Sequence, residues 1–142
     1  MNRRELLVAT GALTAAAAVK AAPDGGAATG GTPAGTGLVE TASACIEAGE
    51  LCHAHCLRQF AAGDTSLAKC DQSVTMMLAM CRALVVAAAQ GSSRLKEVAR
   101  VCGEVCRDCE AACKPHAGHH DVCRRCMEAC RACAAACEKA TA

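Results

Sequence analysis

Cysteine recurs along this chain with the period of an α-helix. The sequence holds 14 cysteines among 142 residues. Two runs have three, two and three residues between successive members: Cys102, Cys106, Cys109 and Cys113, then Cys126, Cys130, Cys133 and Cys137. At about 100° per residue, each run stays within roughly one quadrant of a helix. The spacing therefore predicts two helices that each carry one face of sulfur.

Glycine, proline and capping residues divide the chain into four predicted helices. The helices are expected over about 38–62, from an N-cap among 64–66 to 90, from an N-cap at 92 or 93 to 114, and over 121–140. Short connections place neighbouring helices antiparallel. β-branched and aromatic residues are too scarce for a sheet. The predicted fold class is all-α, an antiparallel up-down-up-down four-helix bundle with a cysteine-lined core.

The remaining cysteines fit the same frame. They are Cys45, Cys52 and Cys56 on the first helix, Cys70 and Cys81 on the second, and Cys123 at the start of the fourth. All fourteen can face inward together. The segments 102–113 and 126–137 match at 8 of 12 positions, so the last two helices look like a duplicated unit.

The N-terminal region has the composition of an export signal and a tether. Residues 1–21 contain the pair Arg3 and Arg4, an apolar stretch over 6–19 and small residues at a cleavage site, which favour twin-arginine export to the periplasm over an ordinary secretory signal. The apolar stretch is shorter than the ~20 residues that span a bilayer, so we expect no membrane span in the mature form. Residues 22–37 are rich in Gly, Ala, Thr and Pro and are expected to form a disordered linker to a metal-binding domain at 38–142.

The net charge gives no support for a nucleic-acid partner. Removal of residues 1–21 leaves 12 basic and 13 acidic side chains, a formal charge of −1. No catalytic triad, phosphate-binding loop or nucleotide motif is visible, and we expect no enzymatic activity.

Metal binding explains the regular thiol spacing better than disulfides do. Cβ atoms four residues apart on a helix are ~5–6 Å apart, whereas a disulfide needs ~3.5–4.5 Å. A two-coordinate metal with bonds of ~2.3 Å spans up to ~4.6 Å between sulfurs. Crowded soft thiolates favour Cu(I), and one Cu⁺ per lost thiol proton leaves the core neutral. A zinc or cadmium buffer like metallothionein, a disulfide-stapled protein and a thiol-redox protein remain open alternatives.

The cysteine-lined bundle, the arginine-pair leader and the segment Cys52-His-Ala-His-Cys56 resemble the exported bacterial copper storage proteins. The resemblance covers about residues 41–139. It implies storage of multiple Cu(I) ions through all fourteen cysteines, with His55 as a further ligand, and a homo-oligomer that is a tetramer.

Bundle topology places the first and third loops at the same end of the molecule. This end is expected to gather five histidines as transient copper ligands: His53, His55, His116, His119 and His120. Met77 is predicted to face the cysteines, where core packing is its expected role and a thioether contact to copper the alternative. Apolar residues that point outward from the first two helices favour these helices as the oligomer surface: Ile46, Leu51, Leu57, Met76 and Val86.

Overall fold

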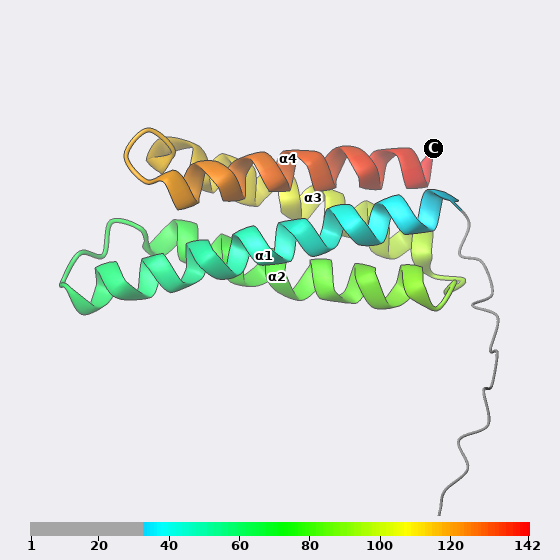
Figure 1. The fold of residues 1–142 in the computed structure, drawn as a ribbon, viewed down its shortest axis with the longest axis horizontal. Coiled ribbons are helices and arrows are strands. Elements are labelled where there is room, and N and C mark those ends of the chain that lie inside the picture. The colour runs from blue at the N-terminus through cyan, green and yellow to red at the C-terminus, as the bar shows by residue number, and fades with distance from the viewer. Residues whose placement is uncertain (1–32) are drawn as a thin grey trace, which may run out of the picture.

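Four helices form the part of the chain that the structure, a computed structural model, describes, which is residues 33–142 (Figure 1). They are α1 (Pro33–Ala61), α2 (Ala68–Ala89), α3 (Leu95–Cys113) and α4 (Asp121–Thr141), with a short 3-10 turn η1 (Lys114–His116) between α3 and α4. The predicted export signal at 1–21 and the linker up to residue 32 lie outside the described residues.

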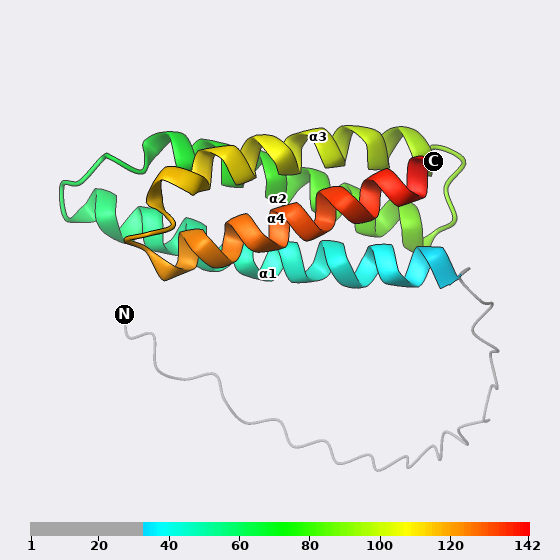
Figure 2. The same cartoon turned by 90° about the horizontal axis from the view of Figure 1, so that it is seen from above.

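The helices run up, down, up and down around one core, which confirms the predicted four-helix bundle. Each helix packs along its length against two neighbours: α1 and α3 both lie beside α2 and α4, whereas the backbones of the diagonal pairs lie farther apart. Figure 2 shows the α1–α2 connection and the η1–α4 connection at one end of the bundle. The α2–α3 connection, the start of α1 and the C-terminus lie at the other end.

Helix α1 begins earlier than the sequence pattern predicts. It starts at Pro33, whereas we expected the linker to continue to residue 37. Proline suits the first turn of a helix because its missing N–H has no helical acceptor there. The two glycines that follow, Gly35 and Gly37, do not prevent helix formation at this end of the domain.

Glycines end the first two helices as predicted, but the predicted N-caps are wrong. Gly63 and Gly91 have φ of 86° and 61°, the left-handed conformation that glycine adopts without steric cost. The N-cap positions of α2 and α3 are Leu67 and Arg94, and neither makes a side-chain capping bond.

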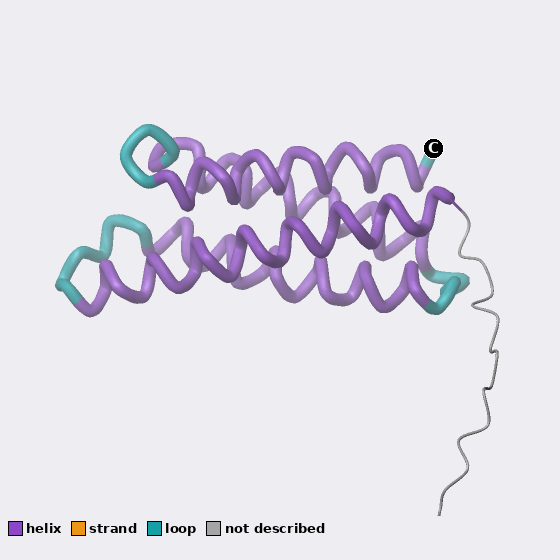
Figure 3. Tube along the Cα trace, viewed as in Figure 1, coloured by secondary structure: helices purple, strands orange, loops and turns teal. Residues whose placement is uncertain are grey.

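Polar side chains stabilise the turns before these helices instead. Asp64 Oδ1 accepts a bond from the Ser66 backbone N–H at 2.9 Å, and Ser92 Oγ accepts one from the Arg94 N–H at 3.2 Å. These are local turn bonds across two residues, which compete with capping for the same side chains. Figure 3 shows the short loops in which they lie.

Small side chains let the helices approach closely around the sulfur-rich core. All fourteen cysteines are buried. The other buried residues are Leu38, Ala42, Gly49, Leu67, Val74, Met77, Leu78, Leu84, Ala87, Ala99, Gly103 and Ala134. A Cβ at Gly103 would lie 3.1 Å from the Cβ of Cys137, so α3 and α4 meet at a distance that only glycine permits without adjustment.

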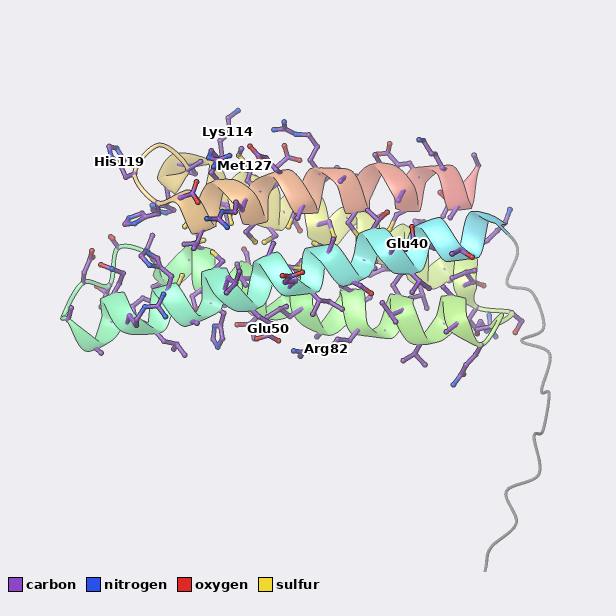
Figure 4. All side chains as sticks on the ribbon, in the orientation of Figure 1. Glu40, Glu50, Arg82, Lys114, His119 and Met127 are labelled. Atoms are coloured by element: carbon purple, nitrogen blue, oxygen red, sulfur yellow. The ribbon has the colours of Figure 1, made fainter. Side chains whose placement is uncertain are left out.

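Charged side chains remain on the surface of the bundle. Glu50 pairs with Arg82 between α1 and α2 (Figure 4). Arg131 pairs with Glu110 between α4 and α3 at 2.7 Å. Exposed pairs of this kind contribute little stability each, about 0–1 kcal/mol. The core must therefore supply most of the free energy of folding.

Helix α2 is the one described helix that is long and apolar enough to cross a membrane, judged by length and composition. Within the bundle, however, one face of this helix is buried. Seven of its residues are buried against the other helices: Cys70, Val74, Met77, Leu78, Cys81, Leu84 and Ala87.

Candidate metal centre

The fourteen thiols form one sulfur-rich core to which every helix contributes. Figure 4 shows the sulfur atoms gathered between the helices. Six close contacts join thiols of different helices, at 3.4–3.9 Å between Sγ atoms: Cys70–Cys113, Cys45–Cys130, Cys52–Cys123, Cys81–Cys102, Cys81–Cys106 and Cys81–Cys133. A disulfide bond is ~2.05 Å long and joins sulfurs strictly in pairs. Here one thiol has several partners, which is the arrangement of a shared metal–thiolate core.

Cys81 occupies the centre of this network. Its Sγ lies within 3.9 Å of the Sγ atoms of Cys102, Cys106 and Cys133. Together with Cys45, Cys106 and Cys133 it forms a set in which all sulfurs lie within 4.8 Å of one another. The set takes one cysteine from each of the four helices. Residues that are far apart in the sequence therefore form one site, which cannot be recognised from the spacing of neighbouring cysteines.

Four sets of three thiols extend the site along the bundle axis. They are Cys52, Cys56 and Cys70; Cys52, Cys113 and Cys126; Cys109, Cys126 and Cys130; and Cys102, Cys133 and Cys137. Cys52, Cys126 and Cys133 each belong to two of the five sets, so neighbouring sets share ligands. Cys123 lies outside all five, but its Sγ is 3.8 Å from that of Cys52. The core thus offers a continuous row of soft ligands.

Helical i,i+4 cysteine pairs take part in three of these sets, each time with a thiol from another helix. The pairs are Cys52–Cys56, Cys126–Cys130 and Cys133–Cys137. The predicted pairing of cysteines on neighbouring turns of one helix therefore describes only part of each set of thiols. Cross-helix neighbours bring a third sulfur within reach, so three-coordinate as well as two-coordinate sites fit.

The core carries no buried charge in the described residues: neither acidic nor basic side chains are buried. Burial, together with nearby Cys70 and Asp71, raises the pKa of the Cys56 thiol to about 12. A thiol with such a pKa stays protonated and neutral at neutral pH. A bound metal cation would replace its proton, and exchange of one proton for one monovalent ion leaves the charge of the core unchanged.

Histidines gather at the end formed by the α1–α2 and η1–α4 connections, as the topology predicts. His55 Nε2 lies 3.0 Å from His120 Nδ1, and the ring centres of His116 and His120 are 6.5 Å apart. Burial, and next the neighbouring His120, lower the pKa of His55. A neutral imidazole results, which is the form that binds metals.

Two of the five predicted histidines lie apart from this group. His53 Nδ1 is 2.7 Å from Asp71 Oδ1, so its partner is a carboxylate on α2. Sequence reasoning missed Asp71, because an acidic residue in the first turn of a helix is ordinary. His119 is exposed and, in Figure 4, lies at the outer edge of the loop.

The opposite end of the bundle is closed by hydrocarbon. Leu38 near the start of α1, Leu84 near the end of α2 and Ala99 near the start of α3 are all buried beyond the last thiols. The two ends therefore differ in chemistry. Imidazole and carboxylate groups border the sulfur core at one end, and apolar side chains seal it at the other.

A match to a protein-family model shows which family the chain belongs to. The model of the copper storage proteins (Csp) matches residues 34–142. The chain belongs to the copper storage protein family. Its resemblance to this family, stated from the cysteine pattern, is confirmed, and the match includes every cysteine and every histidine of the chain.

Solved structures of the family superpose on this chain over most of its length. Apo copper storage protein 3 (Csp3) from Bacillus subtilis has a TM-score of 0.67 and 27% identity, with 75% of this chain and 98% of that chain covered. The Cu(I)-bound copper storage protein BsCsp3 gives 0.66 and 26%, with 77% and 99% covered. The search of curated proteins found no match.

Proposed function

We propose that this protein stores multiple Cu(I) ions as cargo in the thiol-lined core of its bundle. The observation that carries the proposal is the single connected core of fourteen buried thiols without a buried charged side chain among residues 33–142. Family membership and similarity to a Cu(I)-bound relative support the same metal. Storage needs many similar sites rather than one, and the overlapping sets of thiols supply them.

Zinc is the second candidate, because one set of thiols has the composition of a structural zinc site. Cys45, Cys81, Cys106 and Cys133 could surround a metal with four sulfurs. Four thiolates on Zn²⁺ would leave a net charge of 2−, and the described core holds no cation to offset it. Cu(I) with two thiolates leaves 1−, and sharing of thiolates between neighbouring ions reduces this further. Electrostatics thus favours copper.

Copper enters, in this proposal, at the histidine end. His55 and His120 are the two imidazoles in direct contact there, and Cys56 follows His55 by one residue. Imidazole binds Cu(I) more weakly than thiolate does, so an ion held at the mouth can pass to the thiols below. The apolar side chains at the other end give a metal ion no ligand.

Export and assembly complete the proposal. The arginine-pair leader at residues 1–21 supports export. Fractionation of cells that express either the native chain or a variant with Arg3 and Arg4 changed to lysine tests this part of the proposal. Four half-exposed apolar side chains on α1 and α2 support self-association through these helices, with a tetramer expected: Leu51, Leu57, Met76 and Val86. The protein acts as a store and catalyses no reaction.

An anaerobic titration of the reduced protein with Cu(I) against a chromogenic chelator tests the function. We expect uptake of about one copper per thiol, because that ratio keeps the core neutral. The same protein titrated with Zn²⁺ serves as the comparison. Uptake of only one or two coppers, tighter binding of zinc than of copper, or few free thiols before reduction would each contradict copper storage.

The route of entry is tested separately, by the rate of uptake. His120→Ala removes an imidazole that contacts His55, whereas His119→Ala removes one that is exposed and outside this contact. We expect slower stopped-flow loading in the first variant and the wild-type rate in the second. Equal rates in all three proteins would exclude His120 from the entry path while leaving storage itself intact.

A further inference from the structure

A thioether sulfur lies among the thiols of the core. Helix α2 supplies only two cysteines, Cys70 and Cys81, and Met77 occupies the buried face between them. Met77 Sδ is 3.4 Å from Cys45 Sγ and 3.6 Å from Cys81 Sγ. The spacing Met77-x-x-x-Cys81 repeats on α2 the i,i+4 geometry of the paired cysteines elsewhere. Met77 therefore contributes a fifteenth sulfur to the row.

The contact at the other end of the side chain explains why the sulfur faces the thiols. A Cβ at Gly49 of α1 would lie 2.5 Å from Met77 Cε and 2.9 Å from Leu78 Cδ2. The methyl group of Met77 thus fills the space that any larger residue at position 49 would need. Because the methyl group packs against α1, Sδ is left beside Cys45 and Cys81.

The three sulfurs have the dimensions of a three-coordinate site. Bonds of about 2.3 Å in a trigonal arrangement separate the sulfurs by about 4.0 Å. Met77 Sδ lies 3.4 and 3.6 Å from the two thiols, and these thiols belong to a set whose members are all within 4.8 Å. Side-chain shifts of a few tenths of an ångström would therefore suffice to admit a metal ion.

The charge balance favours a thioether at this position. Cu⁺ with three thiolates carries 2−, whereas Cu⁺ with two thiolates and a neutral thioether carries 1−. No basic side chain is buried in residues 33–142, so each uncompensated charge in the core is costly. Thioether sulfur is also a soft ligand that selects Cu(I) over Zn²⁺.

We propose that Met77 is a Cu(I) ligand within the storage core, completing a three-sulfur site with Cys45 and Cys81. The proposal rests on the proposed function, since it takes Cu(I) as the cargo. It assigns chemistry to a residue for which hydrophobic packing is the ordinary role. Met76, which is 58% exposed, and Met80, which is partly buried, have no such sulfur contacts and serve as matched controls.

Selenium X-ray absorption on the copper-loaded protein tests this ligand directly. The full chain carries Met76→Leu, Met80→Leu and Met127→Leu and is labelled with selenomethionine, so that Met77 is the one labelled residue in the described domain. We expect copper loading to add a Se–Cu distance of about 2.4 Å, the metal–sulfur length increased slightly by the larger selenium atom. Addition of Met77→Leu should abolish this distance, because leucine preserves the volume but brings no ligand.

The possible outcomes distinguish the role of Met77 as a ligand from copper storage itself. A full complement of copper with no Se–Cu distance would overturn the role of Met77 and leave copper storage standing. Failure to bind copper at all would overturn both.

Two single variants in the otherwise native chain give a second measurement. Met77→Leu should release one copper equivalent to the competing chelator earlier than Met80→Leu does. Gly49→Ala should act in the same direction as Met77→Leu, because its Cβ displaces the methyl group of Met77. Identical release curves for Met77→Leu and Met80→Leu would contradict the proposal.

Discussion

Replacement of Cys81 by serine tests whether metals in the core share their thiolates. Cys81 has more close thiol neighbours than any other cysteine of the described core, with three Sγ atoms from α3 and α4 at 3.8–3.9 Å. Serine keeps the shape of the side chain but supplies a hard oxygen, which Cu(I) binds poorly. The loss of copper per lost sulfur is therefore a direct measure of sharing.

The magnitude follows from counting bonds. One copper for each of the fourteen thiols keeps the core neutral. If each copper binds two sulfurs, about 28 metal–sulfur bonds are distributed so that each thiolate binds about two coppers. Removal of one thiolate breaks about two of these bonds. We expect the capacity of Cys81→Ser to fall by one to two coppers, to about 12 or 13.

A control must separate the loss of a ligand from the loss of stability. The buried hydroxyl of Cys81→Ser can donate to the carbonyl oxygen of Met77, one turn earlier, so we expect the apo protein to lose only about 1–2 kcal/mol. Val74→Thr places a hydroxyl in the same core, seven residues earlier on α2, and leaves every thiol in place. It should cost similar stability and keep full capacity.

The assay combines anaerobic copper titration with thiol counting and with urea unfolding of the apo proteins. Wild-type capacity in Cys81→Ser would refute the role of Cys81 as a shared ligand, because the loss of a thiolate that binds two coppers must release at least one of them. An equal loss of capacity in Val74→Thr would show that capacity follows fold stability rather than ligand number.

Three further variants test the packing and the surface. Gly103→Ala should lower the free energy of unfolding by about 1 kcal/mol in urea melts, because the clash with the Cβ of Cys137 at 3.1 Å outweighs the gain in helix propensity; a stabilised variant would show that α4 moves away freely. Leu84→Ala should cost about 2–5 kcal/mol at the sealed end without lowering copper capacity, as measured by the same melts and titrations; a lower capacity would mean that this end is not merely a seal. Leu51→Lys should reduce the oligomer mass in sedimentation, since Leu51 is 50% exposed on α1; an unchanged mass would place the interface elsewhere.

Helical periodicity was enough to predict the fold and the burial of the thiols. A cysteine every three or four residues can face one core only on a helix, and the short loops leave antiparallel packing as the simple arrangement. Gly63 and Gly91 mark two helix ends correctly because their left-handed backbone is a local property.

Contacts between helices could not be predicted from spacing. The set of Cys45, Cys81, Cys106 and Cys133 depends on how four helices align along the bundle axis, and no local pattern fixes that alignment. The same holds for Met77, whose sulfur position depends on a glycine of another helix. The predictions of the N-caps were wrong for a different reason. Asp64 and Ser92 form turn bonds two residues ahead, and both uses of these side chains look alike in sequence.

We expect cysteine to allow this bundle to fold without its cargo. Protonated thiols are small and apolar, so they pack as hydrophobic side chains, and hydrocarbon closes the core beyond them at one end. A zinc finger, by contrast, is unfolded without its metal because its few ligands replace a core. We therefore expect copper to exchange with protons inside a bundle that is already formed, where overlapping sets of sulfur would let each ion bind beside the last. The same architecture can therefore hold few or many ions, which is what a store requires and a single rigid metal site cannot provide.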